Sequence, residues 1–226
     1  MLFDLRGAGR RRTVKTVYLG LALLMFVGFV GFSIGSSGLG GGLLDVFTTG
    51  GGGSSSSGTE RFQQQADRAA ARTRANPEDP AAWVALAQAR IRLAGVGDNF
   101  DTGKSDYTPS GRRVLQGAAT AWNKYLDLNP KHPDERLARQ MVQAYVALNQ
   151  PTGAVTAQEI VSDANPTAGT FAQLATYAYA AGQTRKGDLA SQKAVSLAPK
   201  NQRATLKQQL KQAKTQAAGA AATGGG

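Results

Sequence analysis

The sequence has 226 residues, with 26 Lys and Arg against 15 Asp and Glu, one His and no Cys. Without cysteine the chain has no disulfide framework, no thiol catalysis and no Cys-ligated metal site. The single His also excludes His-rich metal sites. Both ends are basic, apolar or Gly/Ser-rich, so the packed core falls to residues 60–214, a length that can fold on its own.

The chain begins with a basic tail, residues 1–15, followed by an uncharged apolar stretch, residues 16–34. A helix over 19 residues is about 28 Å long, close to the thickness of a bilayer core. This predicts a single transmembrane helix over residues 16–34. Because basic flanks stay in the cytoplasm, residues 1–15 are predicted to be cytoplasmic and everything after the helix extracytoplasmic, in an inner or plasma membrane.

Two alternatives compete with the membrane anchor. Ser33-Ile34-Gly35 could serve as a signal-peptide cleavage site, but the apolar run is longer than that of a typical signal peptide. A buried helix of a soluble protein would need packing partners, whereas a flexible stretch follows here. Residues 35–59 contain ten Gly and six Ser, which predicts a coiled linker with a reach of about 25–30 Å.

Beyond the linker, prolines recur in similar surroundings, and the last two intervals are 36 and 33 residues long. Between these prolines lie pairs of Ala-rich stretches with helical periodicity, predicted as helices over 167–181 and about 184–197. Two further helices are predicted over 60–75 and 200–214, the latter as a cap with a polar outer side. The prolines that mark the period are Pro77, Pro130, Pro166 and Pro199.

The spacing of large and small residues within each unit resembles the tetratricopeptide repeat (TPR), a helix-turn-helix of about 34 residues. The first unit carries Trp83, Leu86, Ala87, Ala118, Trp122 and Pro130, with about 19 extra residues between its helices. The second carries Met141, Val142, Tyr145, Ala154, Val161 and Pro166. The third carries Phe171, Leu174, Ala175, Ala178, Gly187, Ser191, Ala194 and Pro199.

The fold class predicted in this way is all-α. It is a TPR-like helical-hairpin solenoid of about three repeats plus flanking helices, behind one N-terminal transmembrane helix. Small residues stand where paired helices would approach most closely, namely Ala118, Ala154 and Gly187. Residues 60–214 form this solenoid, and residues 215–226 are predicted to be a disordered tail.

The insert 95–111 contains Gly103-Lys104-Ser105, but the earlier glycine of a phosphate loop is replaced by Asp98, and no strand precedes it. The insert is predicted to be a solvated loop whose shortening changes stability little. His132 is assigned to the link between units. No catalytic residue, cofactor or metal site is predicted, and the chain is not expected to be an enzyme.

The resemblance implies a protein-interaction scaffold that binds a protein or peptide on the concave face of its first helices. Carried over position by position, the groove consists of Val84, Gln88, Arg92, Arg136, Arg139, Gln143, Val146, Thr176 and Tyr179. Its arginines favour a partner with acidic groups. Val84 and Gln88 replace the Lys and Asn of the family's best-known carboxylate clamp, so that particular clamp is not expected here.

Other functions remain open at this point. The chain could be a bacterial accessory factor of secretion or of cell-envelope or cytochrome assembly, or a structural spacer without a groove ligand. Residues 185–214 hold eight Lys or Arg against Asp188 alone, which fits a solvated cap or a surface attracted to anionic lipid or an acidic partner. Nucleic acid is not an expected partner, and the oligomeric state is undecided.

Overall fold

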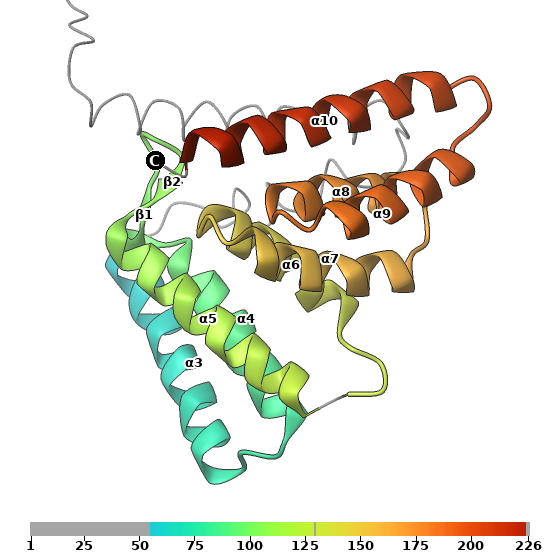
Figure 1. The fold of residues 1–226 in the computed structure, drawn as a ribbon. Coiled ribbons are helices and arrows are strands. Elements are labelled where there is room, and N and C mark those ends of the chain that lie inside the picture. Colours follow the sequence, from blue (N-terminus) through green and yellow to red (C-terminus); the bar gives the residue numbers. More distant parts are fainter. Residues whose placement is uncertain (1–54, 129, 225–226) are drawn as a thin grey trace, which may run out of the picture. The chain divides into compact units, whose positions relative to one another are not determined.

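The computed structural model describes residues 55–128 and 130–224, and this part of the chain is helical apart from one short hairpin (Figure 1). The all-α class is therefore confirmed for these residues. The elements in order are α3 (Ser55–Ala75), α4 (Pro80–Ala94), η1 (Gly97–Asn99), β1 (Phe100–Asp101), β2 (Asp106–Tyr107), α5 (Pro109–Asp127), α6 (Glu135–Ala147), α7 (Pro151–Ala164), α8 (Ala168–Ala180), α9 (Thr184–Leu197) and α10 (Arg203–Gly224).

Several of these helices begin where the local sequence supplies a cap. Asp79 precedes Pro80, and its carboxylate accepts a hydrogen bond from the Ala81 amide at 2.9 Å. Thr108 caps α5 and Asp134 caps α6 in the same way. Thr167 and the residue three positions later form a capping box at the start of α8. A side-chain oxygen that satisfies a free amide at a helix start contributes about 1 kcal/mol, so these residues fix where the helices begin.

The pairs α6–α7 and α8–α9 repeat the same backbone plan with an offset of 33 residues. Both bounds of α8 lie 33 residues after those of α6, and α9 follows α7 by the same interval. The turn inside each pair contains one residue with positive φ, Asn149 at 55° and Gly182 at 72°. Glycine and asparagine are the residues that tolerate this left-handed conformation, so the sequence encodes the same turn twice.

The core lies between helices that are neighbours in the chain. α4 packs on α5, α6 on α7 and α8 on α9, while α3 packs on α4 and α7 on α8. The small residues predicted at the close approaches, Ala118, Ala154 and Gly187, are all buried. Large side chains such as Trp122 and Met141 are also buried in this core. Contacts of this kind are typical of tandem helical hairpins.

Helix α10 packs on both α8 and α9 (Figure 1). Leu206 and Leu210 are buried on its inner side. The predicted helix, 200–214, was too short, since the structure places residues 215–224 of the predicted disordered tail in the same helix. Alanine has the highest helix propensity, and the Ala-rich segment after Gln216 explains why the helix continues.

The boundary of the predicted linker also changes, because α3 begins at Ser55 rather than at residue 60. Thr59, inside the predicted linker, lies against the turn that holds Gly97. A β-carbon added at Gly97, whose φ is +56°, would overlap the Thr59 hydroxyl. Packing of this kind holds the first turns of the helix despite the poor helix propensity of Ser and Gly.

The insert between α4 and α5 is exposed or half-buried over residues 95–110, as predicted for a solvated loop, but hydrogen bonds tie it to the neighbouring helices. The Asn99 side chain donates to the Leu93 carbonyl at 3.0 Å, and the Thr108 hydroxyl donates to the Asp98 carbonyl at 2.7 Å. Gly111 is buried, and a β-carbon there would overlap the carbonyl oxygen of Asn99. The polar composition of the insert reflects hydrogen bonds to the helices as well as exposure to solvent.

Among residues 55–128 and 130–224, no helix combines the length and hydrophobicity that a membrane crossing requires. The predicted transmembrane helix, 16–34, the basic tail, 1–15, and most of the linker fall outside the described residues. They therefore remain predictions.

Candidate functional site

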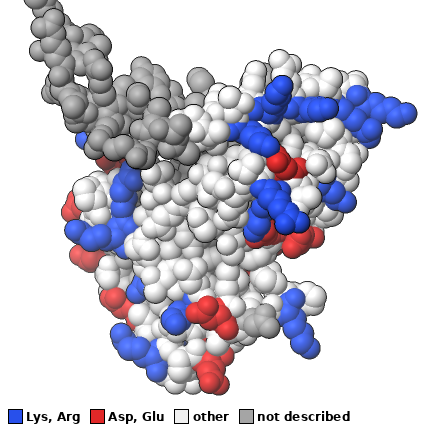
Figure 2. Space-filling model, in the orientation of Figure 1, with Lys and Arg blue, Asp and Glu red and all other residues white. Residues whose placement is uncertain are grey.

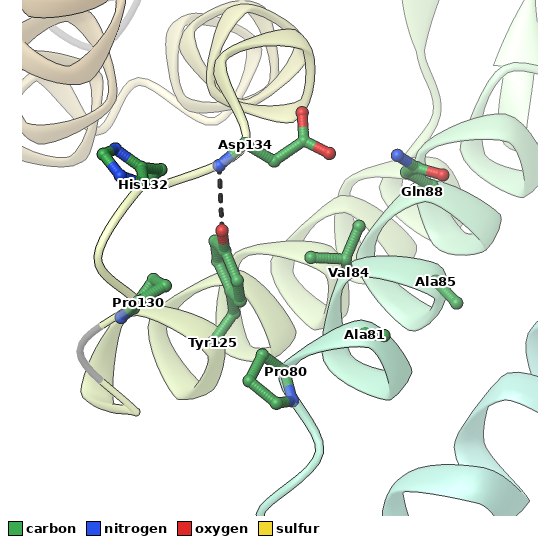
Figure 3. A pocket seen from close by; sticks show the side chains of 9 residues that line it. All are labelled: Pro80, Ala81, Val84, Ala85, Gln88, Tyr125, Pro130, His132 and Asp134. Atoms are coloured by element: carbon green, nitrogen blue, oxygen red, sulfur yellow. Dashed lines mark hydrogen bonds between the residues drawn. The ribbon is translucent and has the colours of Figure 1, made fainter.

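A hollow of about 440 Å³ opens beside α4, between this helix and the link that joins α5 to α6 (Figure 3). Two predicted groove residues, Val84 and Gln88, line it from α4. The other lining residues are Pro80, Ala81, Ala85, Tyr125, Pro130, His132 and Asp134. Residues of the first unit and of the link to the second unit are thus brought together at one place.

The wall opposite α4 is held by hydrogen bonds from the link. The backbone amide of Asp134 donates to the Tyr125 hydroxyl at 2.8 Å (Figure 3). The Asp134 carboxylate accepts from the Leu137 amide at 2.8 Å. The start of α6 is therefore tied to the end of α5. These bonds hold the Asp134 end of the wall beside α5, and a wall held in place before binding lowers the entropy cost of binding.

The lining is largely apolar, with polar groups from Gln88, His132 and Asp134 at its edge. Val84 and the neighbouring alanines and prolines provide an aliphatic surface, and a carboxamide can donate and accept hydrogen bonds. Such a surface fits a side chain of a peptide better than a free ion. No cluster of three or more metal-ligating side chains occurs within the described ranges.

The three predicted arginines differ in exposure and in whether an acidic side chain already binds them. Arg92 and Arg136 are exposed, and neither makes an ion pair within the described residues. Arg139, by contrast, is bound to Glu135 one turn earlier in α6, and its side chain is 31% exposed. Two of the three guanidinium groups can therefore meet an acidic partner without first breaking an internal pair. Gln143 is exposed on α6, and Val146 is half-buried.

The two predicted groove residues of the third unit are buried. Thr176 is 4% exposed, and its hydroxyl donates to the Ala172 carbonyl at 3.0 Å. Tyr179 is 6% exposed, its hydroxyl donates to Asp188 at 2.9 Å, and the Lys214 ammonium lies 5.9 Å from the centre of its ring. The assignment of these two residues to a groove did not anticipate that α10 covers α8.

The cluster of Tyr179, Asp188 and Lys214 joins three helices. Lys214 donates to both oxygens of Asp188, at 2.7 and 2.8 Å. These bonds from Lys214, and the one from Tyr179, lower the pKa of Asp188 because they favour the charged carboxylate. Burial, with the hydrogen bond and charge of Asp188, raises the pKa of Tyr179 to about 12. The cluster ties α10 to α8 and α9.

Sequence reasoning did not include Tyr125, Pro130, His132 and Asp134 in the site. The available signal was the shortness of the link, residues 128–134, which forces it to stay beside the helices that it joins. The family pattern names contacts on first helices only, so it passes over residues of a link.

No protein-family model matches this sequence, and a search of curated proteins finds no match either.

Proposed function

We propose that this chain is a membrane-anchored extracytoplasmic scaffold, with a TPR-like solenoid that binds a protein or peptide on the face formed by α4 and α6. The observation that carries the binding proposal is the hollow beside α4, where Val84 and Gln88 meet a hydrogen-bonded link. The 33-residue offset between the two C-terminal hairpins supports the TPR-like assignment.

The partner would place an apolar side chain in the hollow and an acidic group against Arg136. Arg136 lies two positions after Asp134, so both contacts fall within the span of a short peptide. A guanidinium can bind a carboxylate through two parallel hydrogen bonds, which fixes direction as well as affinity. The location of the anchor, with the N-terminus in the cytoplasm, rests on the apolar run 16–34 and its basic flank.

A photo-crosslinking side chain at position 84 or 88 of the full chain in its native cells tests this proposal. The matched control carries the same group at Thr152, an exposed residue of α7. A discrete crosslinked partner at 84 and 88 but not at 152 supports the scaffold. Loss of the product formed at position 88 in Val84→Arg, with unchanged helicity, supports the hollow as the contact site.

The main alternative is a structural spacer, in which the hairpins position another part of the protein without holding a ligand. A spacer predicts that no discrete partner is crosslinked at positions 84 and 88, or that the same products form at 84, 88 and the control position 152. A protein with an accessory role in secretion or in cell-envelope or cytochrome assembly would also bind a partner as a scaffold does. The identity of the crosslinked partner would distinguish it.

A further inference from the structure

The outer side of α9 carries an alternating row of basic and apolar side chains. Arg185, Leu189, Lys193 and Leu197 follow one another at intervals of four residues, which places them along one ridge of the helix. Leu189 is 60% exposed and Leu197 is 41% exposed, and they are the large exposed hydrophobic residues of the described ranges. Neither Arg185 nor Lys193 forms an ion pair within those ranges.

A second basic row lies beside it on α10. Arg203, Lys207 and Lys211 are exposed and again four residues apart. Arg203 donates to the Ser196 and Ala198 carbonyls at the end of α9, so this row begins against α9. Figure 2 shows Lys and Arg spread over the α9 and α10 part of one face, with few acidic residues among them.

We infer that this α9–α10 face docks on a bilayer surface that contains anionic lipids. Cations attract anionic headgroups, while leucines between them can enter the boundary between headgroups and acyl chains. A partner that is acidic throughout would satisfy the charges but would leave the two exposed leucines uncovered. A lipid surface accounts for both.

The choice of a membrane as occupant rests on the proposed anchor. With a helix over residues 16–34, the segment 35–54 is the only chain between the bilayer and α3. A Gly/Ser segment of this kind reaches about 25 Å. The helical domain would then stay close to the bilayer, where a basic face meets lipid at high effective concentration.

Because the chain has no cysteine, a single engineered cysteine can carry a dye at one chosen position. The full chain with Gln192→Cys, beside the ridge, is reconstituted into phosphatidylcholine vesicles with or without phosphatidylglycerol, and nitroxide-labelled lipid serves as the quencher. The matched control carries the dye at Thr120→Cys on α5. Strong quenching at 192 only with phosphatidylglycerol, and none at 120, is expected.

Replacing Lys193, Lys207 and Lys211 by Gln should lower the ratio of docked to free domain by roughly a hundredfold, since each cation contributes about a fivefold factor near an anionic surface. Replacing Arg68, Arg72 and Arg74 of α3 by Gln removes the same charge and should change nothing. Leu189→Ser with Leu197→Ser should weaken docking while its dependence on salt persists.

Resistance to alkaline carbonate extraction measures the anchor separately. If carbonate extracts the chain, the predicted transmembrane anchor is wrong. The docking of the α9–α10 face is then decided by dye quenching in protein that sediments with anionic vesicles. The inference would be overturned if the dye at position 192 were not quenched, or were quenched equally in neutral vesicles. It would also be overturned if the α3 triple variant lost as much docking as the α9–α10 triple variant. Binding to polyglutamate without binding to lipid would overturn it in favour of an acidic protein partner.

Discussion

The ring of Tyr179 on α8 lies directly over Gly187 on α9, so that a β-carbon at Gly187 would overlap the Cδ1 and Cε1 atoms of the ring. The same relationship recurs between Tyr145 on α6 and Gly153 on α7. In both pairs the glycine follows the tyrosine by eight residues. An aromatic ring and a missing side chain together set how closely the two helices of a hairpin approach.

We expect Gly187→Ala to destabilise the protein, although alanine is the better helix former. Overpacking typically costs about 1–3 kcal/mol, which exceeds the roughly 1 kcal/mol gained in helix propensity. Gly169→Ala in α8 is the matched control, since its nearest neighbouring atom would be 3.8 Å away. Urea unfolding followed by circular dichroism measures both. A more stable Gly187→Ala variant would show that Tyr179 moves aside easily.

The hydrogen bonds between the insert and its flanking helices lead to a second prediction. Replacing residues 97–109 by a four-residue turn should destabilise the protein, because it removes the Thr108 cap and the hydrogen bond from Asn99 to Leu93. The cap alone contributes about 1 kcal/mol. Gly111→Ala should destabilise by about 3 kcal/mol, the upper end of the range for overpacking, since its β-carbon would meet the Asn99 backbone rather than a flexible side chain.

Thermal unfolding of both insert variants checks this prediction. Gly103→Ala, at the tip of the hairpin, is the control, because its nearest contact would be an Asp101 carboxylate oxygen at 3.3 Å. An unchanged melting temperature in the shortened chain would mean that the hydrogen bonds to the insert add nothing to the stability of the folded state.

The buried tyrosines predict a loss of stability in alkali. Burial raises the pKa of Tyr177 to about 12, while in the unfolded chain a tyrosine ionises near its ordinary value of about 10. Between these two values the unfolded state releases a proton that the folded state keeps. The free energy of unfolding therefore falls by about 1.4 kcal/mol per pH unit for this tyrosine, and its contribution is complete below pH of about 10.

Tyr177→Phe should make the fall of the unfolding free energy between pH of about 10 and 12 less steep, by about 1.4 kcal/mol per pH unit. The pKa values of Tyr145 and Tyr179 are also raised to about 12, so these two tyrosines still contribute to the alkaline slope in the variant. Urea unfolding at a series of pH values measures the slope. An unchanged slope in the variant would show that Tyr177 ionises in the folded protein as it does in the unfolded chain.

Arg136 and Arg139 should differ in their effect on partner capture. Arg136→Ala is expected to weaken capture about tenfold, because a hydrogen bond to a charged group contributes about 1.5–3 kcal/mol. Arg139→Ala mainly removes the pair with Glu135 inside α6, worth about 0.3–0.5 kcal/mol of stability. Capture of the partner crosslinked at position 84 provides the assay, with Arg113→Ala on α5 as control. Equal effects of the two α6 variants would remove Arg136 from the site.

The membrane topology is tested on intact spheroplasts. External protease should remove residues beyond about 35, the predicted end of the transmembrane helix, and leave an N-terminal tag protected. Protection of the helical domain would contradict the predicted orientation. A mature N-terminus near Ser36 would show that the apolar segment is cleaved.

The helices were predictable where apolar spacing is regular. The structure has α9 over Thr184–Leu197, as the periodicity indicated, and α8 differs from its predicted bounds by one residue at each end. Helix α8 carries a clear apolar stripe, and Gly182 marks the turn between the two helices. Local signals of this kind survive in the folded chain because they agree with the packing.

The parts that sequence reasoning missed depend on contacts between distant residues. Nothing near Tyr179 in the sequence indicates that Lys214, in another helix, lies over its ring. Likewise, the role of Asn99 in the packing of Gly111 follows from the fold of the insert and not from its polarity. A position in a repeat gives the face of a helix, but not what covers that face.

Because α10 packs mainly on two neighbouring helices, it can unfold separately from the N-terminal hairpin. α10 is held mainly through α8 and α9, whereas the hollow beside α4 belongs to the first hairpin and its link. In a chain of nearest-neighbour contacts, an end can fray without opening the rest. Melting of α10 would expose Tyr179 and leave the Val84 surface intact, so loss of the last helix and loss of the hollow are thermodynamically separable events.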